Sequence, residues 1–198
     1  MVGNTSRRPF VLVANHMVLD FVNTVNARPS FTRDDLTCAD DLVDWACAAG
    51  LVDRAGDETL RRAADASQLA AAVILRESLY HVFGPIAGGH DPVPEALTCV
   101  TDRAAAAIGP ARWIRGDSGF APSWSGDSID SICDRLADEA VQLLRSPAVW
   151  RIGSCAGCGW LFLDTSRAHA RRWCSMNACG VRNKMRRYHQ RQASSSSV

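Results

Sequence analysis

The spacing of hydrophobic and polar residues predicts a mainly α protein. The first apolar stretch, residues 10–26, reads as a short strand that turns into a helix, although periodicity alone does not separate the two over so short a run. The residues it would carry inward are Val18, Phe21, Val22 and Val25. A clearer helix begins at the N-cap residue Thr37 and ends at Gly50, with acidic residues in its first turn.

A longer helical segment follows. Asp57 can cap an Ala-rich run that continues to Phe83 and stops at Gly84-Pro85. One long helix fits this run, and so do two helices with a break near Ala66-Ser67. The expected core positions are Leu69, Ala72, Val73, Tyr80 and Phe83.

Two further helices enclose a predicted β-hairpin. Residues 95–108 are rich in Ala and end at Gly109-Pro110, which predicts a helix. Residues 112–124 contain two strand-like stretches around a Gly-rich turn, which predicts a hairpin. An amphipathic helix then begins at Asp127 and ends at Ser146-Pro147. Its apolar stripe consists of Ile129, Ile132, Cys133, Leu136, Ala140, Leu143 and Leu144. These elements predict a helical domain over residues 1–149.

The C-terminal part contains two pairs of cysteines. Cys155 and Cys158 have the spacing C-x2-C, and after fifteen further residues Cys174 and Cys179 have the spacing C-x4-C. This arrangement is typical of a zinc site in which four thiolates surround one ion. Four cysteines leave no open position for a substrate, so we expect one structural zinc per chain. His169 and His189 lack paired spacing, and we do not expect them to be ligands.

The residues around these pairs predict a finger of the treble-clef type, made of a knuckle, a hairpin and a basic helix. Residues 160–163 read as a strand and residues 171–173 as its returning partner. The run from Val181 to Arg191 contains no helix breaker and predicts a helix with a narrow apolar face. Four aromatic residues could stack on bases, but at these positions we expect them to form the small core of the finger: Trp160, Phe162, Trp173 and Tyr188. The finger spans 150–193, and the Ser-rich tail 194–198 is expected to be disordered.

The net charge of the chain changes sign at the boundary between the helical domain and the finger. Residues 1–150 hold 13 Arg and 20 acidic residues, a net charge of about −7, whereas residues 151–198 hold nine basic residues and one acid, a net charge of about +8. Such a basic segment is typical of a protein that binds nucleic acid or another anion. The candidate residues are Arg182, Lys184, Arg186, Arg187 and Arg191 on the predicted helix, with Arg171 and Arg172 as auxiliaries on the preceding strand.

Polar residues interrupt the first apolar stretch. His16, Asp20, Asn23 and Thr24 lie among apolar neighbours. Two interpretations stay open: these side chains line a small-molecule pocket, or they cap and cross-link the first helix, since buried polar groups are normally hydrogen-bonded. The link 146–154 is short, and its residues Pro147, Val149, Trp150 and Ile152 look packed, which predicts a fixed relation between the two domains.

Other classes of protein are less compatible with the sequence. We expect no membrane span, because no stretch approaches the 18 or so apolar residues that one requires, and no secretory signal is recognisable, so a cytoplasmic protein with reduced cysteines is expected. The scattered Cys38, Cys47, Cys99 and Cys133 fit small buried apolar residues. No phosphate loop, catalytic triad or His/Glu metal motif is recognisable, and we do not expect an enzyme.

The finger resembles a known family. The run Cys-x2-Cys-Gly-Trp-Leu-Phe-Leu-Asp-Thr-Ser, followed by Arg-Arg-Trp-Cys-Ser-Met-x2-Cys-Gly, is similar to the CGNR zinc finger, with Val181 in place of the Asn of the name motif. Upstream, Leu-Asp-Phe-Val-Asn-Thr at 19–24 resembles the ABATE domain that usually precedes this finger. The family comprises stress-induced transcription regulators, so the resemblance implies zinc binding and DNA binding.

The leading hypothesis is a DNA-binding transcriptional regulator whose N-terminal domain senses a small-molecule effector or forms a homodimer. A zinc module that binds RNA is one alternative, because a treble clef fixes neither the groove nor the sugar that it contacts. A protein-interaction module whose basic face docks on an acidic partner is another alternative. We expect no contact with a membrane.

Overall fold

The computed structural model describes residues 9–28, 33–53, 57–63, 65–116, 119–124 and 128–195. Helices dominate these residues, as the sequence predicts, and the strands form three separate two-stranded antiparallel sheets. The elements of the body are α1 (Met17–Val22), β1 (Val25–Asn26), β2 (Arg33–Asp34), α2 (Ala39–Ala48), α3 (Asp57–Ala63), α4 (Ala66–Ala87), α5 (Pro94–Ile108), β3 (Arg112–Gly116), β4 (Gly119–Ser123), α6 (Ile129–Arg145) and the 3-10 helix η1 (Pro147–Arg151). The finger contains β5 (Ile152–Ser154), β6 (Leu161–Leu163), the short π-helix η2 (Met176–Gly180) and α7 (Val181–Ser195).

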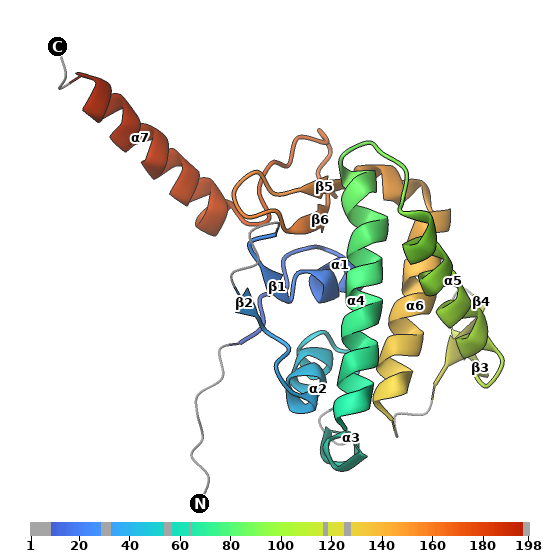
Figure 1. Ribbon diagram of the computed structural model, residues 1–198. Coiled ribbons are helices and arrows are strands. Elements are labelled where there is room, and N and C mark those ends of the chain that lie inside the picture. The colour runs from blue at the N-terminus through green and yellow to red at the C-terminus, as the bar shows by residue number, and fades with distance from the viewer. Residues whose placement is uncertain are drawn as a thin grey trace, which may run out of the picture.

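The centre of the body is the long helix α4 (Figure 1). It contacts α1, α2, α5 and α6, and also β5 and β6 of the finger. By length and composition α4 is long and apolar enough to cross a membrane, contrary to our expectation from the sequence. Its side chains Leu79, Val82 and Phe83 are completely buried against the other helices. We therefore describe α4 as the core helix of the body.

The start of α4 agrees with the prediction and its end does not. Of the two alternatives, a new helix beginning near Ala66-Ser67 is confirmed: α4 begins at Ala66, where Asp65 and Gln68 form a reciprocal capping box. Gly84-Pro85 does not stop the helix, which continues to Ala87. Pro85 cannot donate to the carbonyl of His81, and the N–H of Val93 donates to that carbonyl instead, at 3.2 Å.

The predicted core face of α4 is only partly correct. Ala72 and Phe83 are buried, whereas Leu69, Val73 and Tyr80 are half-buried. The face also includes Arg76, whose side chain is 1% exposed and which donates to both carboxylate oxygens of Asp34, at 2.6 and 2.7 Å. The charge of Arg76 is tolerated inside the body because the Asp34 carboxylate pairs with it. The spacing of hydrophobic residues along the sequence could not predict this buried pair.

The N-terminal segment is less regular than predicted. Residues 10–13 form no strand, and the helix is confined to α1, which His16 caps through Nδ1. Val18, Phe21 and Val22 of α1 are buried, as expected. Val25 is buried too, but it lies in β1 and not in the helix.

The starts of the next two helices also differ from the prediction. The N-cap of α2 is Cys38 rather than Thr37, because the Thr37 hydroxyl donates to Asp41 Oδ2 at 2.6 Å. Asp57 is the first residue of α3 rather than its cap.

The remaining elements of the body match the prediction closely. α5 covers the expected residues, and β3 pairs with β4 from Arg112 opposite Ser123 to Gly116 opposite Gly119. The turn of this hairpin, 117–118, lies outside the described residues, and so does Asp127. Ser128 caps α6 by accepting a hydrogen bond from Asp130 N. The apolar stripe of α6 is buried except at Leu144, which is half-buried.

The body and finger meet without a long linker. Val149 in η1 and Ile152 in β5 are buried, as expected of a packed connection, but Pro147 is exposed and Trp150 is 81% exposed, contrary to the prediction. Ile152 and Leu161, from the two strands of the finger sheet, belong to the same buried cluster as the helices of the body. The finger sheet is thus part of the main core, while α7 points away from the body (Figure 1).

Candidate metal centre and basic helix

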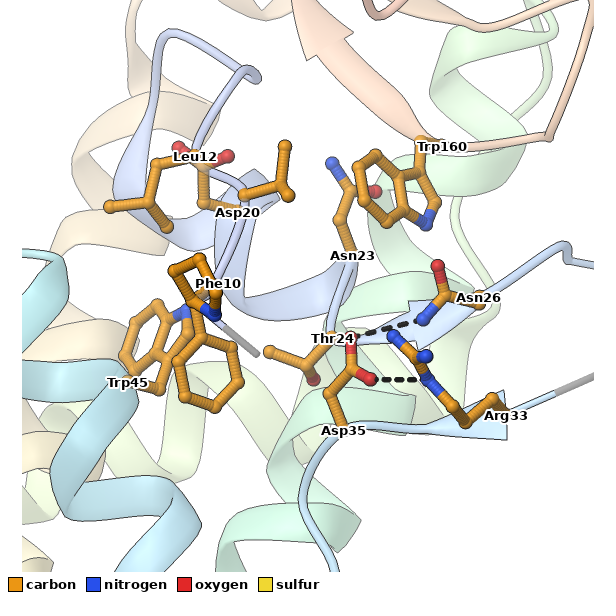
Figure 2. A pocket seen from close by; sticks show the side chains of 12 residues that line it. Phe10, Leu12, Asp20, Asn23, Thr24, Asn26, Arg33, Asp35, Trp45 and Trp160 are labelled. Atoms are coloured by element: carbon orange, nitrogen blue, oxygen red, sulfur yellow. Dashed lines mark hydrogen bonds and ion pairs between the residues drawn. The ribbon is translucent and has the colours of Figure 1, made fainter. Parts of the chain in front are cut away.

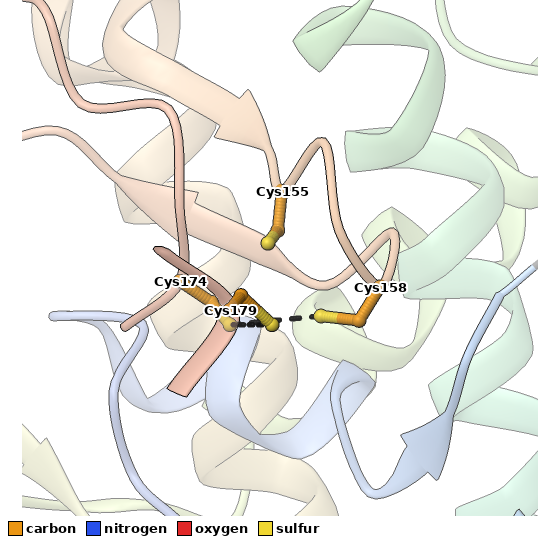
Figure 3. A group of neighbouring side chains, drawn as sticks. All are labelled: Cys155, Cys158, Cys174 and Cys179. Carbon is orange, nitrogen blue, oxygen red and sulfur yellow. Dashed lines mark hydrogen bonds between the residues drawn. The ribbon is translucent and has the colours of Figure 1, made fainter. Parts of the chain in front are cut away.

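The four paired cysteines converge on one point (Figure 3). Their sulfur atoms all lie within 4.8 Å of one another, although Cys155 and Cys158 come from the loop between β5 and β6, Cys174 precedes η2 and Cys179 lies within η2. The Sγ atoms of Cys158 and Cys174 are 3.6 Å apart, and those of Cys174 and Cys179 are 3.7 Å apart. These separations are too long for disulfides, whose sulfur atoms are about 2.05 Å apart.

The same separations fit tetrahedral zinc. With Zn–S bonds of about 2.3 Å, the edges of a regular tetrahedron of sulfur atoms are about 3.8 Å long. Three of these thiols are close enough to perturb one another's pKa. A hydrogen bond with Cys174 lowers the pKa of Cys158 to about 5, whereas the same pairing raises the pKa of Cys174, and burial raises the pKa of Cys179 to about 11. A bound divalent ion would stabilise its thiolate ligands together.

The first pair sits in a tight knuckle. The N–H groups of Cys158 and Gly159 both donate to the carbonyl of Cys155, and Gly157 N donates to its sulfur at 3.4 Å. Gly159 has φ +75°, a conformation that favours glycine. A Cβ on Gly159 would lie 1.9 Å from the carbonyl oxygen of Arg28, so this position fixes the knuckle against the body as well as shaping it.

The hairpin of the finger differs from the predicted one. β6 pairs with β5, which precedes the knuckle, in the register Ile152 opposite Leu163 to Ser154 opposite Leu161. Residues 171–173 form no strand. The return path is held instead by the Asp164 carboxylate, which accepts the N–H groups of Ser166 at 2.8 Å and Arg171 at 3.0 Å. Hydrogen bonding from Ser166 lowers the pKa of Asp164 to about 2.

Arg171 is occupied within the finger. Its guanidinium donates to the backbone carbonyls of Val13, Leu163, Trp173 and Cys174, and it stacks over the Phe162 ring at 4.4 Å. An arginine engaged on so many sides has little capacity left for a phosphate. This geometry argues against the auxiliary DNA contact that we predicted for Arg171, whereas Arg172 is exposed.

The other predicted cations lie on α7. Arg182, Lys184, Arg186, Arg187 and Arg191 are all exposed, and the described part of α7 contains no acidic residue. Phe162 is buried in the small core beside the cysteines, and Trp160 and Trp173 pack against it. Tyr188 does not join this core, contrary to prediction, because α7 leaves the finger and keeps Tyr188 54% exposed.

The polar residues of the N-terminal segment act as caps and cross-links. The Asp20 carboxylate accepts the N–H groups of Val13 and Ala14, both at 2.9 Å, although burial raises its pKa. Thr24 donates to the Phe21 carbonyl at 2.8 Å. Asn23 reaches the finger and forms two hydrogen bonds with the backbone of Leu161. Their position among apolar neighbours identified these residues in the sequence, but it did not predict the groups that they contact.

Three of these four residues also line a hollow of about 180 Å³ beside the finger (Figure 2). Asp20, Asn23 and Thr24 lie along one side of it, between Trp45 and Trp160, and His16 does not line it. The Trp45 indole N–H is buried and has no partner among the described residues, whereas Trp160 Nε1 donates to the carbonyl of Val25 at 2.9 Å. A pocket and a set of cross-links therefore coexist at this junction.

Comparison with protein families assigns both parts of the chain. Residues 15–147 match the ABATE family, described as "Putative stress-induced transcription regulator". Residues 151–192 match the CGNR zinc finger. No curated protein matches the chain. The finger match and the cysteine geometry together assign one structural zinc to Cys155, Cys158, Cys174 and Cys179. The chain belongs to the ABATE family and carries a CGNR zinc finger at its C-terminal end.

Proposed function

We propose that the protein is a zinc-dependent, DNA-binding transcriptional regulator in which α7 contacts the DNA. The observation that carries this proposal is the position of α7, which extends from the zinc centre away from the body with five exposed cationic side chains (Figure 1). Clustered like charges repel one another unless an anionic partner is present. A phosphate backbone supplies such a partner, and zinc fixes the start of the helix that meets it.

We assign the phosphate contacts to Arg182, Arg186 and Arg187, with Lys184 and Arg191 on the same helix and Arg172 beside it as further contributors. None of Arg182, Arg186 and Arg187 forms an ion pair with the described residues. Exposed guanidinium groups of this kind can contact the phosphate backbone without reading the base sequence.

We further propose that the ABATE body regulates the finger, through a small-molecule effector or a homodimer contact. This role is supported by the shared core and by the hydrogen bonds from Asn23 and Trp160 across the junction. An effector that changes the affinity for DNA must have its own affinity changed by DNA by the same factor. Because a thiolate site requires reduced cysteines, we place the protein in the cytoplasm.

The test is the binding of the zinc-loaded protein to a random duplex across a salt series. Neutralisation of four or five phosphates gives a slope of log affinity against log salt of about −4. Replacement of Arg186 and Arg187 by Ala should flatten this slope by about 2, while Arg112→Ala on the exposed hairpin should leave it unchanged. An affinity that does not change with salt would contradict the proposal.

A further inference from the structure

A cleft runs beside Trp173, between α7 and the residues that precede η2. It consists of two adjoining hollows of about 590 and 370 Å³, whose shared walls contain Arg172, Trp173 and Met176. α7 forms the opposite wall of the larger hollow and contributes Val181 and Tyr188. We refer to the larger hollow and its neighbour together as the α7 cleft.

The charge in the α7 cleft is of one sign. The larger hollow contains four cationic side chains and no acidic one among its lining residues. These cations are Arg172, Lys184, Arg187 and Arg191. Lys184, Arg187 and Arg191 are spaced by three and four residues, so they lie along one side of α7. Arg182 and Arg186 do not line the cleft. The two groups of cations can therefore be tested separately.

Flat and apolar side chains lie among these cations. Tyr188 is 54% exposed and Met176 is 71% exposed, although neither is needed to fill the small core of the finger. Trp173 is half-buried: part of it packs beside the cysteines, and part of it lines both hollows. Phosphate contact alone requires none of these side chains. Aromatic rings beside a basic groove are typical of surfaces on which unpaired bases stack.

We propose that the α7 cleft binds unpaired nucleotides, with bases stacked on Trp173 and Tyr188 and phosphates held by Arg172, Lys184 and Arg187. The inference rests on the proposed function, since it requires the finger to bind nucleic acid, and it adds that the cleft selects a single-stranded or locally opened form. The stacked bases of an intact duplex do not present their faces to such rings. The carboxylates of an acidic protein segment would neutralise the cations, but they would not stack on the rings of Trp173 and Tyr188.

The test compares a labelled 12-nucleotide oligothymidine with a 12-base-pair duplex, by fluorescence anisotropy on the zinc-loaded full chain at equal salt. We expect the oligothymidine to bind at least as tightly as the duplex. Tyr188→Ala should weaken oligothymidine binding about tenfold, and Tyr188→Phe should restore it to within about twofold, because phenylalanine keeps the stacking face. Trp113→Ala replaces an equally exposed aromatic residue on β3 and should change neither affinity.

The basic residues provide the second arm of the experiment. Lys184→Ala with Arg187→Ala should weaken oligothymidine more than Arg182→Ala with Arg186→Ala does. The inference is overturned if the duplex binds but oligothymidine binds at least tenfold more weakly and Tyr188→Ala changes neither affinity. It is also overturned if oligoglutamate of equal charge competes as well as oligothymidine. If neither nucleic acid binds, the proposed function fails together with this inference.

Discussion

The side-chain amide of Asn23 pairs with the backbone of Leu161 in both directions. Asn23 Nδ2 donates to the Leu161 carbonyl at 2.8 Å, and the Leu161 N–H donates to Asn23 Oδ1 at 2.9 Å. Asn23 is 4% exposed and Leu161 is 1% exposed, so water cannot readily replace these bonds. One residue of the ABATE body thus holds the free edge of β6, the strand that leaves the first zinc knuckle.

Asn23→Ala should therefore lower the free energy of unfolding by about 3 kcal/mol, because it leaves a buried N–H and a buried carbonyl of Leu161 without partners. Urea unfolding followed by circular dichroism measures this change. Asn15→Gly is the matched control, since Asn15 also bonds β6, through the Leu163 carbonyl at 3.1 Å, but at an exposed position, and glycine tolerates the φ of +62° found there. Equal losses in the two variants would show that burial of the Asn23 pair is not the cause.

Gly159→Ala should destabilise the protein much more than an ordinary glycine replacement. The added Cβ would meet the carbonyl oxygen of Arg28 at 1.9 Å, and Arg28 is itself held by two hydrogen bonds to Glu77 of α4, at 2.7 and 2.8 Å. Gly50 has a similar φ, +72° against +75°, but a Cβ there would meet nothing within 4 Å.

The Gly50→Ala variant therefore measures the backbone cost alone, about 1–2 kcal/mol. We expect the loss of unfolding free energy in Gly159→Ala to exceed this by at least about 2 kcal/mol, as backbone must move to relieve the contact. Thermal and urea unfolding of both variants give the comparison. Similar losses would mean that the knuckle and Arg28 separate without cost.

The sequence was most informative where the signal is local. The spacing of the cysteines identified the metal centre, and the amphipathic pattern identified α5, α6 and the hairpin nearly to the residue. A pattern in one segment cannot reveal a partner in another. The continuation of α4 through Pro85 depends on Val93, and the pairing of β6 with β5 rather than with residues 171–173 depends on the shared core.

The roles of charged residues show the same limit. The sequence presents Arg171 and Arg172 as equivalent neighbours in a basic segment. In the folded protein the first is enclosed by four backbone carbonyls and the second is exposed, because an irregular loop turns them in different directions. Likewise, the period of α7 groups Tyr188 with Val181 and Met185, but only the fold shows that no core covers this face.

Arg171 and Arg186 should consequently give opposite results on replacement by Ala. Loss of the Arg171 guanidinium should lower the free energy of unfolding by about 3 kcal/mol, since it satisfies several backbone carbonyls at once. Loss of Arg186, an exposed side chain, should change stability by less than about 0.5 kcal/mol but reduce the salt slope of DNA binding by about 1. Measurement of both quantities on both variants checks the pair. A reduced salt slope in a folded Arg171→Ala variant would show that Arg171 contacts phosphate after all.

Removal of zinc should destabilise the body as well as the finger. A structural zinc site contributes on the order of 10 kcal/mol to the folding of its domain. Here Ile152 and Leu161 of the finger sheet are packed in the same cluster as α4, so their release opens the core of the body.

Cys174→Ser should bind less than stoichiometric zinc and should lower the melting temperature of the whole helical signal. Cys99→Ala, which replaces a half-buried cysteine outside the cluster, should keep one zinc per chain and a nearly unchanged melting temperature. Metal analysis and thermal unfolding by circular dichroism measure both effects. A body that melts at the same temperature with and without zinc would contradict the shared core, and a Cys174→Ser variant with a full complement of zinc would contradict the four-cysteine site.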